Sequence, residues 1–387
     1  LDGAMGTMLQ KAGLKLGERP EAICIEKPEI ITDIHRQYVE AGSQIVYANT
    51  FGANRHKLEG TGLEVDKVIE AAVKCAKNAV EGTDAIVALD IGPIGELLEP
   101  SGTLSFESAY DIFKEMVVIG EKAGCDIIVF ETMTDLYEVK AGLLAAKENT
   151  SLPVICTMTF EENGRTFTGC SVEAMAAVLE ELGADGVGIN CSLGPDEIFP
   201  IAKRLAMATT LPVVVKANAG LPDPITNTYD ITADKFAESM KQYAEIGIRV
   251  MGGCCGTTPD YIRRTIEVLS ESISSDIKEE ENDSNSSEII RYVPQFNRKL
   301  SEGKKVIAVE LDPPENADIS KFMKNAGMLK NAGVDIITIA DCPIARARVD
   351  SSLLACKLKR ELNIDVIPHL TCRDRNINAT KALLLGL

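Results

Sequence analysis

Short apolar runs rich in Val and Ile recur along the first 270 residues, and amphipathic segments separate them. The separating segments, such as 29–42 and 172–184, carry apolar residues at positions i, i+3, i+4 and i+7, with a glycine near the end of each. This pattern predicts strands that alternate with helices. The apolar runs are SQIVYAN (43–49), DAIVALD (84–90), DIIVFE (126–131), LPVICTMTF (152–160), DGVGIN (185–190), LPVVVKAN (211–218) and IRVMGG (248–253).

Residues 1–3 (LDG) read as the end of an earlier run, which brings the predicted strands to eight. The runs lack polar–apolar alternation, as strands buried on both faces of a parallel sheet do. Eight strand–helix units in about 260 residues predict an α/β fold, a closed (β/α)8 TIM barrel. An open, doubly wound sheet is the alternative, but the segment GAMGT (3–7) is too short for the phosphate-binding fingerprint expected there.

The segment 270–290 breaks this pattern because it is rich in Ser and acidic residues and contains no aromatic residue. We therefore predict an acidic, Ser-rich linker between a barrel domain at 1–269 and a second domain at 291–387. Three strand–helix units cannot close a barrel, so we expect the second domain to be a partial, truncated β/α barrel. Its apolar runs are KKVIAVEL (304–311), VDIITIA (334–340) and IDVIPHL (364–370).

The composition limits the partners and the compartment. The 387 residues include 40 Lys and Arg against 58 Asp and Glu, a formal net charge of −18, so we expect neither nucleic acid nor a membrane surface as a partner. No apolar run reaches the roughly 18 residues that suggest a membrane-spanning helix. Eleven cysteines spread over a long chain indicate reduced thiols and a cytoplasmic protein. The chain begins with Leu1, so we expect a few preceding residues in the complete protein.

Three cysteines follow two of the predicted strands at their carboxyl ends, where TIM barrels carry their chemistry. Cys191 follows the sixth strand, and Cys254 and Cys255 follow the eighth. These strands are near neighbours around a closed ring, so we expect the three thiols on one side of the barrel mouth. Glycines on both sides of the adjacent pair permit the irregular backbone that turns both sulfurs toward one point.

Three convergent thiolates suit Zn²⁺, which prefers four tetrahedral ligands, and the open fourth position is typical of a catalytic site. A thiol substrate fits that position because zinc deprotonates a coordinated thiol. Two alternatives stay open. The cysteines are buried structural residues, or Cys254 and Cys255 form a vicinal redox disulfide.

Other strand ends suggest how the rest of such a substrate is bound. Asp2 and Glu131 are carboxylates suited to an ammonium group, although capping of a strand or helix end is an alternative. The backbone N–H groups of Ala4 and Met5, in a turn flanked by glycines, suit a carboxylate. An amino acid that bears a thiol satisfies all three requirements.

Four further polar residues lie at strand ends. Asn190 and Asn218 hydrogen-bond to the substrate or tie down loops. We expect Asn49 to hold a loop and Asp90 to orient one.

Seven motifs that end or follow the predicted strands occur in a characteristic order. They are DGAMGT (2–7), YANTFGAN (47–54), DIGPIGE (90–96), FETMTD (130–135), GINCSLGP (188–195), KANAG (216–220) and GGCCGTTP (252–259). Through them, residues 1–268 resemble the zinc-dependent homocysteine S-methyltransferase family, in particular the homocysteine domain of the cobalamin-dependent methionine synthase type. The resemblance implies that Cys191, Cys254 and Cys255 bind zinc and that the homocysteine sulfur completes the site. It also implies that Asp2 and Glu131 contact the homocysteine amino group.

The last 80 residues resemble the start of methylenetetrahydrofolate reductase, through VELDPP (309–314), DIITIADCP (335–343) and PHLTC (368–372). This resemblance implies that Glu310 is a proton donor and that His369 lies in an FAD site; a strand-end histidine satisfied by its neighbours is the alternative for His369. The second strand ends in Ala340-Asp341, where some members carry Thr-Tyr. Because the later strands of that fold are absent, we do not expect reductase activity from this chain alone.

Together these features predict a methyltransferase that transfers a methyl group to the thiolate of homocysteine, giving methionine, fused to a reductase-like half. The alternatives are a flavin-dependent folate reductase with an auxiliary barrel and a vicinal-cysteine redox module. The methyl donor stays open among methyl-tetrahydrofolate, a methyl-corrinoid protein, S-methylmethionine and S-adenosylmethionine.

Overall fold

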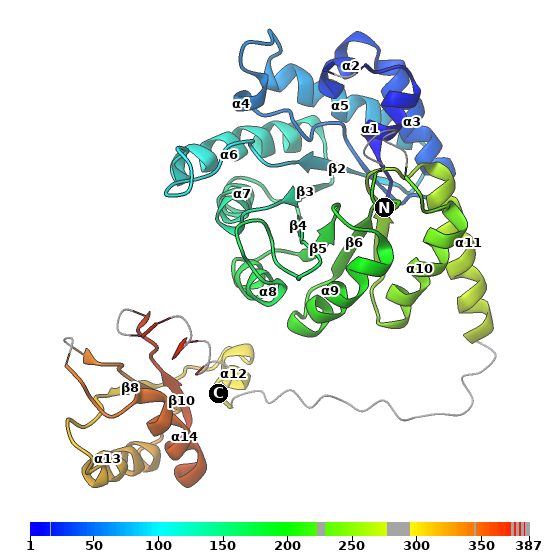
Figure 1. The fold of residues 1–387 in the computed structure, drawn as a ribbon. Helices are drawn as coiled ribbons and strands as arrows, with labels where there is room; N and C mark the ends of the chain where they lie inside the picture. Colours follow the sequence, from blue (N-terminus) through cyan, green and yellow to red (C-terminus); the bar gives the residue numbers. More distant parts are fainter. Residues whose placement is uncertain are drawn as a thin grey trace. The chain divides into compact units, whose positions relative to one another are not determined.

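The chain forms two compact units, Leu1–Asn282 and Asp283–Leu387 (Figure 1). The computed structural model describes residues 1–15, 17–222, 229–276, 295–343, 346–372, 375–376, 379–380 and 383. Among these residues, no helix is both long and apolar enough to cross a membrane.

The first unit is a curled sheet of seven parallel strands in sequential order, with helices around its outside (Figure 1). All seven apolar runs from 43 to 253 form strands, as predicted. The strands are β1 (Ile45–Tyr47), β2 (Ile86–Ile91), β3 (Ile127–Met133), β4 (Val154–Met158), β5 (Gly186–Asn190), β6 (Val213–Ala217) and β7 (Val250–Gly253). The helices are α1 (Met5–Lys11), α2 (Pro20–Glu26), α3 (Pro28–Glu40), α4 (Arg55–Leu58), α5 (Val65–Val80), α6 (Phe106–Ala123), α7 (Leu136–Asn149), α8 (Val172–Glu181), α9 (Pro195–Ala208), α10 (Ala233–Glu245) and α11 (Pro259–Asp276).

The predicted strand at residues 1–3, the first along the chain, is reduced to hydrogen bonds made by Leu1 and Asp2. The Asp2 N–H donates to the Ile45 carbonyl over 3.1 Å, and the Gly253 N–H donates to the Asp2 carbonyl over 3.0 Å. The Leu1 amino group donates to the Met251 carbonyl over 2.7 Å. Residues 1 and 2 thus bridge β1 and β7, the two end strands of the sheet. The α/β barrel architecture is confirmed, and the open doubly wound alternative is not.

The strands are buried on both faces, as their unbroken apolar sequences require. Every residue of β4, β5 and β6 is buried. Polar side chains begin the surrounding helices: those of Ser105, Asp135, Ser171 and Thr232 accept hydrogen bonds from first-turn N–H groups. The helices therefore start at defined residues and press their apolar faces onto the sheet.

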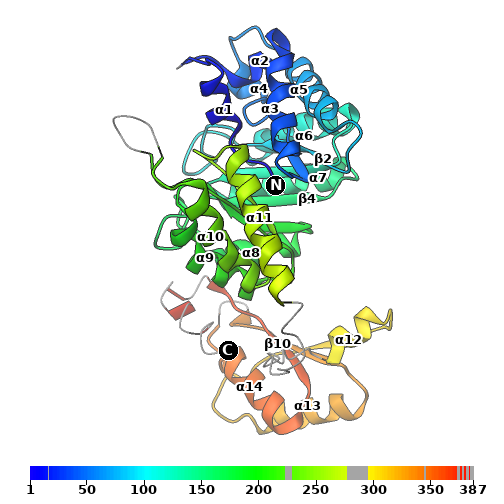
Figure 2. The same cartoon turned by 90° about the vertical axis from the view of Figure 1, so that its right-hand side faces the viewer.

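Helices α10 and α11 pack side by side on the outside of the first unit (Figures 1 and 2). Helix α11 extends to Asp276 and so continues into the segment predicted as a linker. Residues 277–290 of that segment lie outside the described residues.

The second unit contains the three parallel strands predicted, in the order β10-β9-β8. They are β8 (Ala308–Leu311), β9 (Ile336–Ile339) and β10 (Asp365–Pro368), with helices α13 (Ser320–Asn331) and α14 (Ser351–Leu362) between them. Helix α12 (Gln295–Ser301) precedes β8 and has no counterpart among the predicted elements. The core of this unit is formed chiefly by Phe322, Ala326, Ile337, Ile339, Leu354 and Leu358.

Candidate active site

A cavity of about 320 Å³ opens at the carboxyl ends of the barrel strands. Because parallel strands end at the same edge of a sheet, polar residues far apart in sequence meet there. Predicted site residues that line it are Asp2, Ala4, Met5, Glu131, Cys191, Cys254 and Cys255. Further polar residues in its wall are Glu21, Asp90 and Lys216.

The three cysteines of this cavity gather their sulfurs at one point. All three Sγ atoms lie within 4.8 Å of one another, and those of Cys191 and Cys255 are 3.9 Å apart. Cys191 leaves β5 with a φ of 63°, a turn that swings its side chain out of the strand direction. The N–H of Cys254 donates to the Ala217 carbonyl over 2.7 Å, which ties the loop after β7 to the end of β6.

Gly256 fixes the loop that carries the adjacent pair. Its φ is +82°, and an added Cβ atom would lie 2.3 Å from the ring of Tyr229. Both observations require glycine at this position. The sequence expectation that glycine shapes the backbone beside Cys254 and Cys255 is therefore confirmed.

The donor set fits a zinc ion. Four sulfur ligands at about 2.3 Å in a tetrahedron lie about 3.8 Å from one another, close to the 3.9 Å between Cys191 and Cys255. Without metal, the hydrogen bond with Cys191 and burial hold the pKa of the Cys254 thiol well above its usual value. A divalent cation would reverse this because it stabilises the thiolates.

Asn190 supports this centre from inside the barrel. Its Oδ1 accepts from the Thr132 N–H over 2.7 Å and from the Thr157 hydroxyl over 2.8 Å. Its Nδ2 donates to the Thr132 hydroxyl over 2.7 Å and lies 3.9 Å from Sγ of Cys254. Its amide thus has partners within the protein, and neither Asn190 nor Asn218 is among the residues that line the cavity.

Asp2 and Glu131 come together, but a lysine of the protein lies between them. Nζ of Lys216 is 3.2 Å from Oδ1 of Asp2 and 3.4 Å from Oε2 of Glu131. It also lies 3.5 Å from the centroid of the Tyr47 ring. Burial disfavours the charge on Lys216, but the two carboxylates outweigh it and hold the pKa of the ammonium group well above its usual value.

Sequence reasoning missed Lys216. The available signal is the single cation inside the buried run LPVVVKAN, because a lysine in a strand buried on both faces needs an anionic partner. The backbone N–H of Ala4 is also occupied, since it donates to Oγ1 of Thr257 over 3.3 Å. Met5 is the first residue of α1, at the cavity wall.

Glu310 and His369 lie close together in the second unit. Nε2 of His369 lies 3.9 Å from Oε2 of Glu310, with the side chains 43% and 58% exposed. The backbone of His369 is anchored, since its N–H donates to the Ile339 carbonyl over 2.8 Å and its carbonyl accepts from the Ser351 hydroxyl over 2.8 Å.

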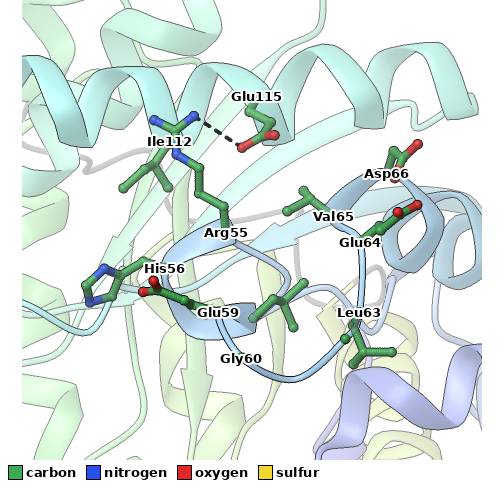
Figure 3. A pocket seen from close by; sticks show the side chains of 12 residues that line it. Arg55, His56, Glu59, Gly60, Leu63, Glu64, Val65, Asp66, Ile112 and Glu115 are labelled. Atoms are coloured by element: carbon green, nitrogen blue, oxygen red, sulfur yellow. Dashed lines mark hydrogen bonds and ion pairs between the residues drawn. The ribbon is translucent and has the colours of Figure 1, made fainter.

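A larger hollow of about 940 Å³ lies elsewhere on the first unit, and Figure 3 shows its lining. It lies between the loop that joins α4 to α5 and helix α6, where Arg55 pairs with Glu115 over 3.5 Å. None of the predicted site residues lines it.

Residues 1–269 match the family model described as homocysteine S-methyltransferase. The chain belongs to this family. Residues 295–386 match the model described as methylenetetrahydrofolate reductase. Both predicted resemblances are thus confirmed, including the fusion of a homocysteine S-methyltransferase domain with a reductase-like one.

Relatives of this homocysteine S-methyltransferase family member are known by sequence and by structure. Methionine synthase from Mycobacterium leprae is 34% identical over 284 residues, which cover 68% of this chain and 23% of the relative. The Mycobacterium tuberculosis methionine synthase is 33% identical, with 68% and 24% covered. The chain thus spans about a quarter of the length of these relatives.

The solved structures support the same fold. The metallated form of the homocysteine methyltransferase MmuM from Escherichia coli is 25% identical, with a TM-score of 0.61, over 69% of this chain and 95% of MmuM. Its oxidized form gives a TM-score of 0.61 at 24% identity over 69% and 94%.

Proposed function

We propose that the first unit transfers a methyl group to the thiolate of homocysteine, giving methionine, at a zinc ion held by Cys191, Cys254 and Cys255. The observation that carries this proposal is the gathering of three sulfurs within 4.8 Å at the wall of a cavity in a homocysteine S-methyltransferase barrel. The metallated form of the related MmuM supports the metal.

The cavity offers a complement to each part of homocysteine. A bound zinc ion would lower the pKa of a coordinated thiol and so supply a thiolate at neutral pH. Asp2 and Glu131 attract the α-ammonium group, and the first turn of α1 at Met5 faces the α-carboxylate. The thiolate sulfur then forms a bond to the methyl carbon while the donor leaves with the electron pair of its broken bond.

Lys216 reduces the net negative charge that Asp2 and Glu131 contribute to the cavity. With Lys216 between them, Asp2 and Glu131 carry one net negative charge instead of two when both are ionised. The remaining negative charge attracts the substrate ammonium group. The same lysine also keeps the two carboxylates apart and oriented when no substrate is bound.

We propose that the protein binds zinc and homocysteine and is located in the cytoplasm. Each of the eleven cysteines is a free thiol, which suits a reducing compartment. The methyl donor is open among methyl-tetrahydrofolate, a methyl-corrinoid protein, S-methylmethionine and S-adenosylmethionine. We further propose a division into a methyltransferase domain at 1–269, a linker at 270–290 and a reductase-like domain at 291–387.

In the second unit we propose that Glu310 donates a proton and that His369 contacts FAD. The 3.9 Å separation of their side chains and the match to the reductase family support this assignment. Flavin absorbance of the purified protein tests it. A colourless protein that takes up no added FAD would contradict flavin binding by this chain.

The experiment for the first unit measures zinc content and homocysteine methylation with each donor in turn. We expect about one zinc per chain, and loss of zinc and activity together on chelation. Cys254→Ser should lose both, whereas Cys170→Ser, a half-buried cysteine outside the cavity, should retain both. A Cys254→Ser protein with full zinc and full activity would refute the assignment.

A redox role is the second candidate, favoured by the 3.9 Å between the Cys191 and Cys255 sulfurs. A disulfide formed from two of these thiols would lower the mass by about two daltons and exclude the metal. Mass spectrometry of untreated protein before and after reductant, with metal analysis of the same sample, separates the two functions.

A further inference from the structure

Asp90 has a buried carboxyl oxygen without a hydrogen-bond partner among the described residues. It lies in β2, near the carboxyl end, is 7% exposed and lines the cavity beside Glu131. Its Oδ1 is buried and accepts no hydrogen bond from any residue in the described part of the chain. Oδ1 of Asp90 therefore makes no hydrogen bond to a described residue through which it could orient a loop, the role expected from the sequence.

The backbone of Asp90 is anchored at the cavity wall. The Asp90 N–H donates to the Thr50 hydroxyl over 3.1 Å, and that hydroxyl donates to the Asp90 carbonyl over 2.7 Å. A buried acceptor without a hydrogen-bond partner has an energetic cost, which a ligand that donates to it removes. Such a cost at a rigid position facing a cavity is typical of a group whose partner is a ligand.

The nearby cations are committed to other groups. Lys216 contacts Asp2, Glu131 and the Tyr47 ring. Lys57 lies over the Phe51 ring, 5.1 Å from its centroid. Four carboxyl groups line the cavity, and Lys216 contacts those of Asp2 and Glu131. Glu21 accepts a hydrogen bond from the Gly52 N–H over 2.9 Å, which leaves Oδ1 of Asp90 as the buried carboxyl oxygen without a partner among the described residues.

We propose that Asp90 binds the α-ammonium group of the amino acid substrate, as a third carboxyl beside Asp2 and Glu131. This inference rests on the proposed function and extends it. The substrate ammonium is the second cation of the cluster, and Lys216 remains in place as the first. Asp90 thereby contributes to selection of α-amino acids over thiols that lack an amino group.

Binding of the substrate ammonium group should be coupled to release of a proton to solvent. Burial, and then the charge of Glu131, raise the pKa of Asp90, so this carboxyl group ionises less readily than an exposed one. The groups that face Asp90 are Glu131 on β3, Lys216 on β6, Asp2 at the chain start, Glu21 on α2 and Lys57 on α4. A substrate ammonium group beside Asp90 favours the carboxylate, so a proton held by this carboxyl group leaves to solvent on binding.

L-Methionine is the probe, because it has the ammonium and carboxylate groups but no thiol proton. Titration calorimetry of the zinc-loaded full chain in two buffers of different ionisation enthalpy counts the protons released. We expect up to one proton per methionine for the wild type. Asp90→Asn should release none and bind methionine roughly tenfold to hundredfold more weakly.

Two controls isolate the effect. Asp84→Asn changes an exposed carboxylate that lies just before the first residue of β2, at the end of the strand opposite to Asp90. This variant should behave as the wild type. The amine-free probe 4-(methylthio)butanoic acid should bind wild type and Asp90→Asn equally, without proton release. Circular dichroism verifies that Asp90→Asn is folded.

A folded Asp90→Asn protein that keeps the wild-type affinity for methionine would overturn the inference. So would equal affinity of the wild type for methionine and for the amine-free probe, whatever the fold of the variant. In those cases zinc binding and homocysteine methylation are unaffected and the proposed function stands. A wild-type chain that binds neither zinc nor methionine contradicts the proposed function itself, and this inference with it.

Discussion

The ammonium group of Lys216 lies 3.2 Å from the carboxylate of Asp2, although 214 residues separate them in sequence. The contact exists because residues 1 and 2 lie between the two end strands of the sheet, one strand away from β6. Both side chains are about 4% exposed, so water screens this pair very little. Asp2, Lys216 and Glu131 therefore form a buried cluster of charges at the cavity without any bound substrate.

Removal of Lys216 should destabilise the barrel strongly. Lys216→Met leaves Asp2 and Glu131 buried without their cation, a change that typically costs about 3–5 kcal/mol. Urea unfolding followed by circular dichroism measures the loss. Adding Glu131→Gln to Lys216→Met should restore part of it, because one of the two uncompensated charges is removed.

The surface pair of Lys77 and Asp126 supplies the control. It is shorter, at 2.7 Å, but both side chains are 37% exposed. Lys77→Met should cost at most about 1 kcal/mol. Equal losses for Lys77→Met and Lys216→Met would show that burial of the cluster has no energetic consequence.

We expect Asn190 to increase the zinc affinity of the cysteine site without contacting the substrate. Asn190→Ala removes the amide near Sγ of Cys254 and the two bonds to Thr132, a residue with a φ of 59°. We expect zinc affinity, measured by competition with a chelator, to fall roughly tenfold to hundredfold. Thr159→Val loses only a hydroxyl bond to the Asn190 carbonyl and should keep its zinc. Unchanged affinity in Asn190→Ala would contradict the supporting role.

The sequence pattern was sufficient for the strands and for the meeting of the three cysteines. Barrel topology brings the carboxyl ends of the strands together whatever the side chains are. The proximity of Cys191 and Cys255 could therefore be predicted from the sequence alone. The role of Lys216 and the lack of a partner among the described residues for Oδ1 of Asp90 could not be found in this way. Both depend on which way one side chain points in a strand buried on both faces, and periodicity carries no information on that.

Gly256 offers a test of the loop that carries the cysteine pair. Gly256→Ala places a methyl group 2.3 Å from the Tyr229 ring at a φ of +82°. Gly247→Ala has a similar φ of +86° with nothing within 4 Å, so it measures the backbone strain alone. We expect Gly256→Ala to lower zinc affinity and stability well beyond Gly247→Ala. Similar effects of the two substitutions would mean that the ring contact is relieved without moving the cysteines.

His35 should make stability depend on pH. It is fully buried on α3, and neither ring nitrogen has a hydrogen-bond partner among the described residues. Burial lowers its pKa from 6.5 to about 4, only partly offset by Asp2. Below pH 6.5 the unfolded chain therefore binds a proton that the folded chain does not, and stability falls as the pH falls toward 4.

Between pH 7 and pH 5 this group alone should cost about 2 kcal/mol, measured by urea unfolding at each pH. His35→Leu removes the titrating group while keeping an apolar side chain in the core, so its stability should change less over that interval. His56→Gln, a half-exposed position, should retain the wild-type slope. If His35→Leu and the wild type lost equal stability between the two pH values, the acid sensitivity would arise elsewhere, and the buried imidazole would have to be protonated in the folded chain.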